Sequence, residues 1–371
     1  MSTSLEVLSG ELVAKRLFDV AFAIDLTQVE RLWTARTGAS LQRKKLSSTP
    51  PKAVAFDVPP VVLELEAVAL LVDGKPTTMR ASARVYDFGV VSLALHLPVS
   101  NLPWLGFVSL ANSVDQAIGA QALSPIWPRL LDQVLAITQA ASTRPLVSEL
   151  QEDYLYASVR SFDAAIKADE LQKAVDLIPL LSGESRPLSE GTQRDLLRNR
   201  FSYYDDDLVV LTWDRAFIYD PRGDTDVADV LEIANAQLLE MRYYDDLLDD
   251  ELPRMYDLVE STRKAIWPIA PGRYAKLAHR LYGLVAEVTE LKEKVDNALQ
   301  VTEDVYLARI YSSALDQFRV PSVSEAVDRK LSIIRDTYIA LYDESSSRRA
   351  EILEVTIVLL ILVELILALL H

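Results

Sequence analysis

The C-terminal end of the chain constrains its architecture most. From Ile352 to Leu370 the sequence reads ILEVTIVLLILVELILALL, which is almost wholly apolar. As a helix this run extends about 28 Å, at about 1.5 Å per residue, and nearly spans the hydrocarbon core of a bilayer. Arg348 and Arg349 stand just before it, and positive charge on that flank keeps the preceding chain on the cytoplasmic side. The sequence therefore predicts a C-terminal transmembrane tail anchor over residues 351–371.

Two glutamates oppose this interpretation. Glu354 lies near the arginine-flanked edge of the run, whereas Glu364 lies within a few residues of its centre. An acid at the centre of a bilayer costs on the order of 2.5–3.5 kcal/mol on insertion scales. The summed apolar residues should outweigh that cost. The same pattern also fits a helix that is wholly buried at the core of an oligomer.

Residues 1–223 carry mixed strand and helix patterns, which predict a mixed α/β head. Asp73-Gly74 stands between two apolar runs and is a tight hairpin signal. Strand patterns cover 13–24 and 61–97, and a helical pattern covers about 105–141. A second, mixed segment contains EDYLYASVRSF at 152–162, a helix near 169–181 and a strand pair at about 200–221. The head is therefore expected to contain a sheet with helices packed on it.

A short internal sequence similarity raises the question of whether the head contains two related halves. Residues 86–93 read YDFGVVSL and residues 204–211 read YDDDLVVL, so both place an acidic turn before an apolar strand. Two hairpin halves that share one sheet would produce this pattern. Chance recurrence of a common turn and strand accounts for it equally well.

Residues 224–350 change to long helical patterns. From Leu277 to Val305, apolar residues recur at alternating spacings of four and three, which is the register of a coiled coil. The residues predicted to mediate self-association, here called the coil seam, are Leu277, Leu281, Leu284, Val288, Leu291 and Val295. A second segment with this spacing follows Pro321, so the partner helix lies in the same chain, as a hairpin, or in another subunit. A hairpin requires the first helix to break between Ala298 and Asp304.

The predicted fold class is thus α+β. It comprises a mixed α/β N-terminal head, then long coiled-coil helices, and finally one C-terminal transmembrane helix. The corresponding domains are 1–223, 224–350 and 351–371.

Charge and composition exclude several classes of function. The 38 Lys and Arg residues against 54 Asp and Glu give a formal net charge of −16, which argues against broad electrostatic binding of nucleic acid. The chain has no cysteine and 3 histidines, so thiolate metal sites, cysteine nucleophiles and histidine-rich metal sites are excluded or poorly supplied. No glycine-rich phosphate loop or catalytic motif is found. We therefore expect no catalytic, cofactor-binding or metal-binding residues and no cofactor.

Two groups of carboxylates keep an enzymatic alternative open. Asp205, Asp206 and Asp207 are adjacent in one group, and the second group comprises Asp245, Asp246, Asp249, Asp250 and Glu251. Clustered acids can hold magnesium or act as general acid and base. Asp is also favoured at turns for its backbone hydrogen bonds, and a solvated helix face accounts for the second group.

Three segments together resemble one known family, the required-for-meiotic-nuclear-division proteins. They are YDFGVV at residues 86–91, KLSII at residues 330–334, and RRAEILE at residues 348–354 leading into the apolar run with Glu364. The histidine and tryptophan usual in that family near the membrane entry are not found here, which indicates a divergent and bacterial member. The resemblance implies a mixed α/β head, long helices, a C-terminal span and no catalytic residues. It also implies relatives that form homo-oligomers in the mitochondrial inner membrane and support translation.

These observations predict a non-enzymatic, tail-anchored, self-associating membrane scaffold whose cytoplasmic head recruits or organises partners. The expected location is the bacterial inner membrane, or the mitochondrial inner membrane in a eukaryote. The expected partners are the lipid bilayer, further copies of the chain and a protein or ribosome, with no direct contact to nucleic acid. The alternatives are a tether that supports translation through ribosome contact and a metal-dependent membrane-tethered enzyme that uses the Asp205–Asp207 turn.

Overall fold

The computed structural model describes residues 5–38, 58–122, 124–223, 226–263, 270–298 and 305–370. The chain divides into two compact units, which are described separately here. Unit 1 contains residues 1–240 and 294–321, and unit 2 contains residues 241–293 and 322–371. The fold class is α+β with one large sheet, as predicted.

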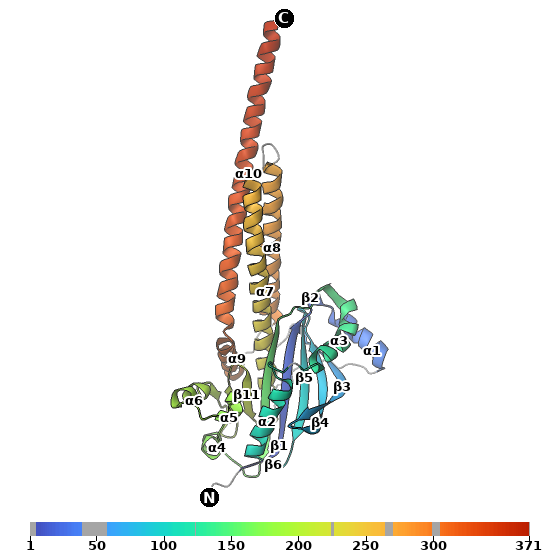
Figure 1. The fold of residues 1–371 in the computed structure, drawn as a ribbon, viewed down its shortest axis with the longest axis vertical. Coiled ribbons are helices and arrows are strands. Elements are labelled where there is room, and N and C mark those ends of the chain that lie inside the picture. The colour runs from blue at the N-terminus through green and yellow to red at the C-terminus, as the bar shows by residue number, and fades with distance from the viewer. Residues whose placement is uncertain are drawn as a thin grey trace. The chain divides into compact units, whose positions relative to one another are not determined.

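Unit 1 is built on a nine-stranded sheet with the order β3-β4-β5-β1-β8-β11-β10-β9, in which β6 pairs with the start of β1 (Figure 1). The strands of this sheet are β1 (Glu6–Asp19), β3 (Val61–Val72), β4 (Lys75–Val85), β5 (Val90–Val99), β6 (Leu102–Pro103), β8 (Gln151–Phe162), β9 (Arg200–Phe201), β10 (Leu208–Leu211) and β11 (Arg215–Tyr219). Neighbours are antiparallel except β8 and β11, which run parallel. A separate two-stranded sheet joins β2 (Ala21–Ile24) to β7 (Ser142–Pro145).

The hairpin predicted at Asp73-Gly74 connects β3 to β4. Val72 pairs with Lys75 across a two-residue turn, and both turn residues have positive φ, 49° for Asp73 and 70° for Gly74. Two positive φ angles match the twist of the flanking strands, which is why this dipeptide is a hairpin signal.

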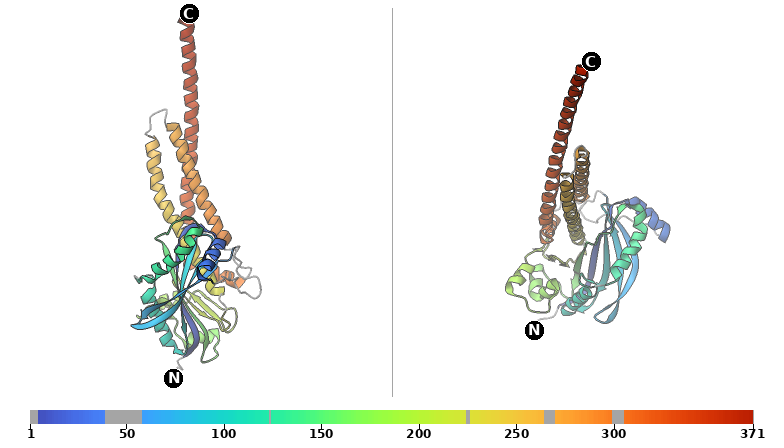
Figure 2. Two further views of the ribbon diagram at one scale, coloured as in Figure 1. Left: turned by 90° about the vertical axis from the view of Figure 1, so that its right-hand side faces the viewer. Right: turned by 45° about the horizontal axis from the view of Figure 1, so that its top comes forward.

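Helices cover both faces of the sheet, so its central strands are buried on both sides. The helices that lie wholly in unit 1 are α1 (Leu26–Thr37), α2 (Trp104–Ile118), α3 (Ile126–Thr138), the short η1 (Gln139–Ala141), α4 (Ala168–Ala174), α5 (Ile178–Ser182), α6 (Glu190–Leu196) and α9 (Val305–Gln317). Helices α2 and α3 pack on one face (Figure 2). The first turns of α7 (Asp226–Arg263) and α9 pack on the other face, where Phe318 contacts Tyr154 of β8. Burial on two faces explains why β1 reads as a nearly continuous buried run rather than an alternating one.

Unit 2 is helical and contains the later part of α7, α8 (Ala270–Ala298) and α10 (Val320–Leu370). Its buried side chains include Leu248 of α7, Leu281 of α8 and Ile334 of α10. Pro253 lies inside α7, which continues through it. The break that a hairpin would require between Ala298 and Asp304 falls on residues 299–304, which lie outside the described chain, so it stays a prediction.

The predicted tail anchor is wrong for the residues that the structure describes. None of their helices contains a stretch long and apolar enough to cross a bilayer. The apolar run of α10 contains Glu354 and Glu364, and an acid near the centre of a bilayer costs on the order of 2.5–3.5 kcal/mol. The side chains of Arg348 and Arg349, the expected charged flank, lie outside the described part. This finding overturns the transmembrane, tail-anchored interpretation.

Candidate functional site

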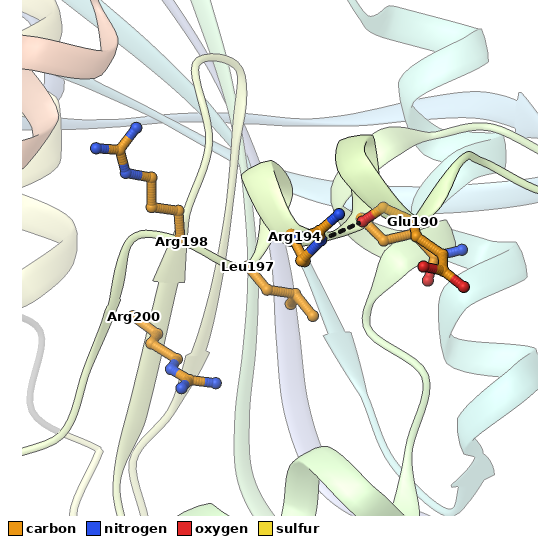
Figure 3. Close-up of a pocket in the computed structure, with 6 residues that line it drawn as sticks. Glu190, Arg194, Leu197, Arg198 and Arg200 are labelled. Atoms are coloured by element: carbon orange, nitrogen blue, oxygen red, sulfur yellow. Dashed lines mark hydrogen bonds between the residues drawn. The ribbon is translucent and has the colours of Figure 1, made fainter.

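An arginine-lined hollow lies where α6 leads into the edge strand β9 of unit 1. Its cavity has a volume of about 550 Å³ and is lined by Arg194, Arg198 and Arg200, with Glu190 and Leu197 between and beside them (Figure 3). Arg194 Nε donates to the backbone oxygen of Glu190 at 3.2 Å. The Arg194 guanidinium is thereby bonded to its own helix, while Arg198 lies in the turn after α6 and Arg200 begins β9.

A second cavity, about 810 Å³, adjoins the first and lies between β9 and α9. Arg198 and Arg200 line both cavities, and α9 adds Arg309. The Arg309 guanidinium carbon lies 5.9 Å from the centre of the Phe201 ring, close enough for a cation–π contact. The four arginines 194, 198, 200 and 309 together define what is called the arginine groove below.

Positive charge dominates the arginine groove although the whole chain carries a formal charge of −16. Glu190 and Asp316 are the acidic residues among those that line the two cavities. In the described part of the chain no carboxylate forms an ion pair with any of the four arginines. Arg200 instead donates to the side-chain oxygen of Gln172 at 2.8 Å, which leaves its charge uncompensated. Such a local basic surface favours an anionic ligand.

Exposed aromatic residues follow the groove, but their rings are already in contact with other groups. Tyr203 packs on Tyr306 of α9, with ring centres 5.3 Å apart. The guanidinium carbon of Arg222 lies 3.6 Å from the centre of the Tyr204 ring. These contacts favour packing within unit 1 over base stacking. The other tyrosine pair, Tyr243 and Tyr244, lies on α7, where Tyr244 is buried.

A buried charge cluster joins α7 to the sheet on the face opposite α2. Glu232 of α7 accepts from Lys15 of β1 and from the Tyr86 hydroxyl, the latter at 2.9 Å, and pairs with Arg84 of β4 at 3.1 Å. Arg84 also donates to Asp229 at 2.8 Å. Burial alone would raise the pKa of Glu232, but Arg84 and Lys15 outweigh it and lower that pKa to about 2. The same burial and the charge of Glu232 raise the pKa of Tyr86 well above its usual value. All five polar groups are thus satisfied by one another, and the cluster fastens α7 to the sheet.

Asp19, at the end of β1, is a buried carboxyl outside this cluster. We expect it to make the stability of the protein depend on pH. Burial raises its pKa to about 7, although the backbone N–H of Ala21 partly offsets this. Since the folded state then binds the proton more tightly than the unfolded chain, stability is lost as pH rises from about 4 through about 7. Replacing Asp19 by Asn should raise the thermal midpoint at pH 8 and change it little at pH 4, as measured by differential scanning fluorimetry.

The matched control for this prediction is Asp132→Asn on the exposed surface of α3. It makes the same substitution on another element, at an exposed position, and should not change the pH dependence. An Asp19→Asn variant whose midpoint falls below that of the unmodified chain at pH 8 would contradict the argument.

The two carboxylate groups proposed for metal binding are engaged in other contacts. Asp207 accepts from the backbone N–H of Tyr203 at 2.7 Å, and Asp205 pairs with Lys167 at 3.2 Å. In the second group, Asp245 and Asp249 both lie 2.6 Å from Lys330. No group of three metal-ligating side chains occurs among the described residues. The geometry therefore gives the metal-dependent alternative no site in this part of the chain.

The coil seam lies on α8, with Leu277 to Leu291 in unit 2 and Val295 in unit 1, and the structure places its residues in different surroundings. Leu277, Leu281 and Val288 are buried within the single chain, and Leu284 is half-buried. The side chains of Leu291 and Val295 lie outside the described residues. Tyr282 of α8 contacts Tyr338 of α10, with ring centres 5.8 Å apart. A coiled coil is not shown, and self-association through these residues stays a prediction.

Neither the arginine groove nor the charge cluster was singled out by sequence reasoning. The groove had a visible signal, because Arg194, Arg198 and Arg200 stand within seven positions of an otherwise acidic chain. The buried charge cluster had no visible signal in the sequence. Lys15 and Arg16 are adjacent on opposite faces of β1, so the sequence does not show which of the two pairs with a carboxylate. Glu232 lies in a long helix rich in acids, where a solvated position is the default expectation.

Comparison with known proteins identifies the family of this chain. A family model described as "Uncharacterized protein MJ0711, N-terminal domain" matches residues 9–225. The uncharacterized protein MJ0711 of Methanocaldococcus jannaschii is 27% identical over 217 residues, or 58% of this chain and 64% of that protein. The chain thus spans less than two thirds of the length of this curated relative.

The matched region covers most of the sheet of unit 1 and includes Arg194, Arg198 and Arg200, but it ends before α7 and α9. No solved structure matches the chain. The comparisons support an uncharacterized family, and membership of the required-for-meiotic-nuclear-division proteins is not shown. On the length of its match to the family model, the chain belongs to the family of the MJ0711 N-terminal domain.

Proposed function

We propose that the protein is a non-enzymatic, self-associating scaffold whose unit 1 recruits partner proteins. In this proposal the apolar run of α10 forms the core of an assembly of identical chains. One observation carries it, namely that the run from Leu353 to Leu367 is exposed on every side of the helix within the single chain.

The exposure of α10 is continuous around its axis. Each large apolar side chain from Leu353 to Leu367 is between 44% and 64% exposed. The seven residues from Ile357 to Val363 are consecutive, and at 3.6 residues per turn they cover every direction around the helix. A contiguous apolar surface of this kind marks an interaction site, and a helix that is apolar all round is one that becomes buried. Copies of α10 from identical chains would bury this apolar surface against one another in a symmetric oligomer.

Two further features favour assembly of identical chains. Glu364 is exposed in the single chain, and a polar group in an apolar helix core is best tolerated when neighbouring copies supply hydrogen bonds to it. The resemblance to the required-for-meiotic-nuclear-division proteins carries the same expectation of a homo-oligomer.

The mass of the full chain in solution tests the proposal. One chain has a mass of 41.4 kDa, and light scattering after size exclusion should give at least twice that value. Replacing Val358 and Leu362 together by Asp should reduce the mass to that of one chain, because two charges would enter the apolar interface. Leu105→Asp on α2, where the leucine is 74% exposed, is the control and should leave the mass unchanged.

An unmodified chain that elutes as a monomer would overturn the scaffold proposal. Glu364→Leu separates a second question, because an unchanged mass in that variant means that the acid is tolerated without specifying the assembly. A changed mass means that Glu364 sets the number of copies, as buried polar residues do in coiled coils.

A further inference from the structure

We propose that the arginine groove binds an acidic protein segment in extended conformation, which adds as a strand along the open edge of β9. The inference rests on the proposed function in one respect, namely that unit 1 recruits a partner protein, and it names the chemistry of that partner. The observations that carry it are the free sheet edge, the placement of the arginines and the wall formed by α9.

The sheet of unit 1 ends at β9, whose far side has no neighbouring strand among the described residues. The Leu211 N–H donates to the Asn199 oxygen at 3.0 Å, and Arg200 pairs with Val210 next along the strand. Antiparallel strands alternate hydrogen-bonded and non-hydrogen-bonded pairs. Arg200 therefore directs its backbone N–H and C=O away from β10, toward the open edge. An edge that presents these groups is a template for an added strand.

The arginines stand where the side chains of such a strand would meet them. Arg198 lies in the turn between α6 and β9, Arg200 is the first residue of β9, and both line the two cavities of the groove. Both are exposed, and Arg309 approaches from α9 across the same cavity. An added strand with acids at alternate positions would present a row of carboxylates to these guanidinium groups, which bind carboxylates through two parallel hydrogen bonds.

The second wall of the groove sets the length of segment that fits. The residues of α9 that line the cavity run from Val305 to Gln317, which is about 18 Å of helix. An extended chain rises about 3.3 Å per residue, so about five or six residues would lie along this wall. Phe201 and the exposed Val305 supply apolar surface for the side chains between the acids.

A protein segment is favoured over a nucleic acid as the occupant for two reasons. The nearby tyrosine rings that could stack on bases are in contact with Tyr306 and Arg222. The open backbone groups of Arg200 suit another peptide backbone, whereas a nucleic acid would use the charges alone. The chain as a whole is also strongly acidic, which opposes a long polyanion more than a short peptide.

Fluorescence anisotropy on the full chain with a labelled ten-residue peptide of alternating Glu and Val tests the proposal. We expect saturable binding that weakens about ten-fold or more when Gln replaces Glu in the peptide, or when Arg198 and Arg200 are both replaced by Glu. Arg129→Glu on the exposed surface of α3 makes the same type of charge change away from the groove and should leave binding intact. An unchanged thermal midpoint in Arg198→Glu/Arg200→Glu shows that the loss is not unfolding.

Backbone pairing is tested separately from charge. Methylating the alternate peptide nitrogens that face β9 should abolish binding, whereas methylating the other set, which faces solvent, should not, because only the first set donates to the sheet edge. Equal effects of the two sets, or tighter binding of single-stranded poly-uridine than of the peptide, would overturn the inference.

Failure of this inference is distinguishable from failure of the scaffold proposal. The Val358→Asp/Leu362→Asp chain should still bind the peptide even as a monomer. The Arg198→Glu/Arg200→Glu chain should keep the assembled mass while it loses the peptide.

Discussion

Replacing Glu232 by Gln is expected to lower the free energy of unfolding of unit 1 by about 3–5 kcal/mol. The substitution keeps the size of the side chain and removes its charge. Lys15 is 7% exposed, and the Arg84 side chain is 17% exposed. Lys15 would lose its carboxylate partner inside the protein, and Arg84 would keep only Asp229, at 2.8 Å. A buried charge without a partner is among the most costly defects a single substitution can create.

The same substitution should change how stability depends on pH. The pKa of Glu232 is lowered to about 2 by Arg84 and Lys15 against the opposing effect of burial. A carboxyl with a lowered folded pKa contributes stability that is fully present above about 4.5 and is lost as pH falls toward about 2. Glu232→Gln should therefore flatten the acid limb of the stability profile. An acid limb as steep as that of the unmodified chain would contradict this assignment.

Urea unfolding followed by tryptophan fluorescence measures this effect in the full chain. A Trp267→Phe background leaves tryptophans at positions 33, 104, 127 and 213, all within unit 1. The matched control is Glu11→Gln, because Glu11 pairs with an Arg80 side chain that is 62% exposed. An exposed pair contributes about 0–1 kcal/mol. The double variant Glu232→Gln/Lys15→Met should recover part of the loss by removing one unpaired cation.

Gly89→Ala is expected to destabilise unit 1 by about 3 kcal/mol or more, for a reason unrelated to charge. Gly89 has a φ of 103°, which L-residues rarely adopt. A Cβ atom at this position would overlap the backbone carbonyl of Ala21, which is not the end of a flexible side chain and cannot move aside cheaply. The Gly89 oxygen also accepts from the Val20 N–H at 3.0 Å, so a shift of the turn would break that contact.

Gly74→Ala is the matched control for this prediction. Gly74 also has a positive φ, 70°, but open space surrounds the position of its Cβ atom. Its substitution should therefore cost only the backbone strain, about 1–2 kcal/mol. Equal losses for the two variants in urea unfolding would show that the contact with Ala21 is not responsible.

Much of the sheet could be predicted because its turns have local signals. Asp73-Gly74 specifies a hairpin through two positive φ angles, and this is a property of two adjacent residues. The helix α1 has a local signal too, since Asp25 caps it by accepting from the N–H groups of Thr27 and Gln28. The pattern of this region predicted strands, and the cap at Asp25 and the helix that follows it were missed. The order of strands could not be predicted, because β1 finds its neighbours through contacts between distant segments.

The sites were less predictable than the fold for a related reason. Three residues of the heptad spacing from Leu277 are buried on α8, namely Leu277, Leu281 and Val288. The spacing alone does not say which helix covers them, and the coiled coil stays a prediction. The apolar run of α10 predicted a membrane span. The run contains two acids, Glu354 and Glu364, and no described helix is long and apolar enough to cross a bilayer. Glu232 and its partners meet only when α7 reaches the sheet, so no short segment of sequence contains the interaction.

The central position of β1 has a consequence for how the chain is made. It is synthesised before both of its neighbours, β5 and β8, and the counter-charge for Lys15 on α7 is 217 residues away. Contacts between such distant segments slow folding, and strand edges are prone to aggregation before their partner strands have been synthesised. During translation β1 therefore emerges with neither of its neighbours and with a cation that has no partner. Until α7 has been synthesised and packs on the sheet, chaperones must keep β1 apart from other nascent chains. The yield of folded protein should depend on how long they do so.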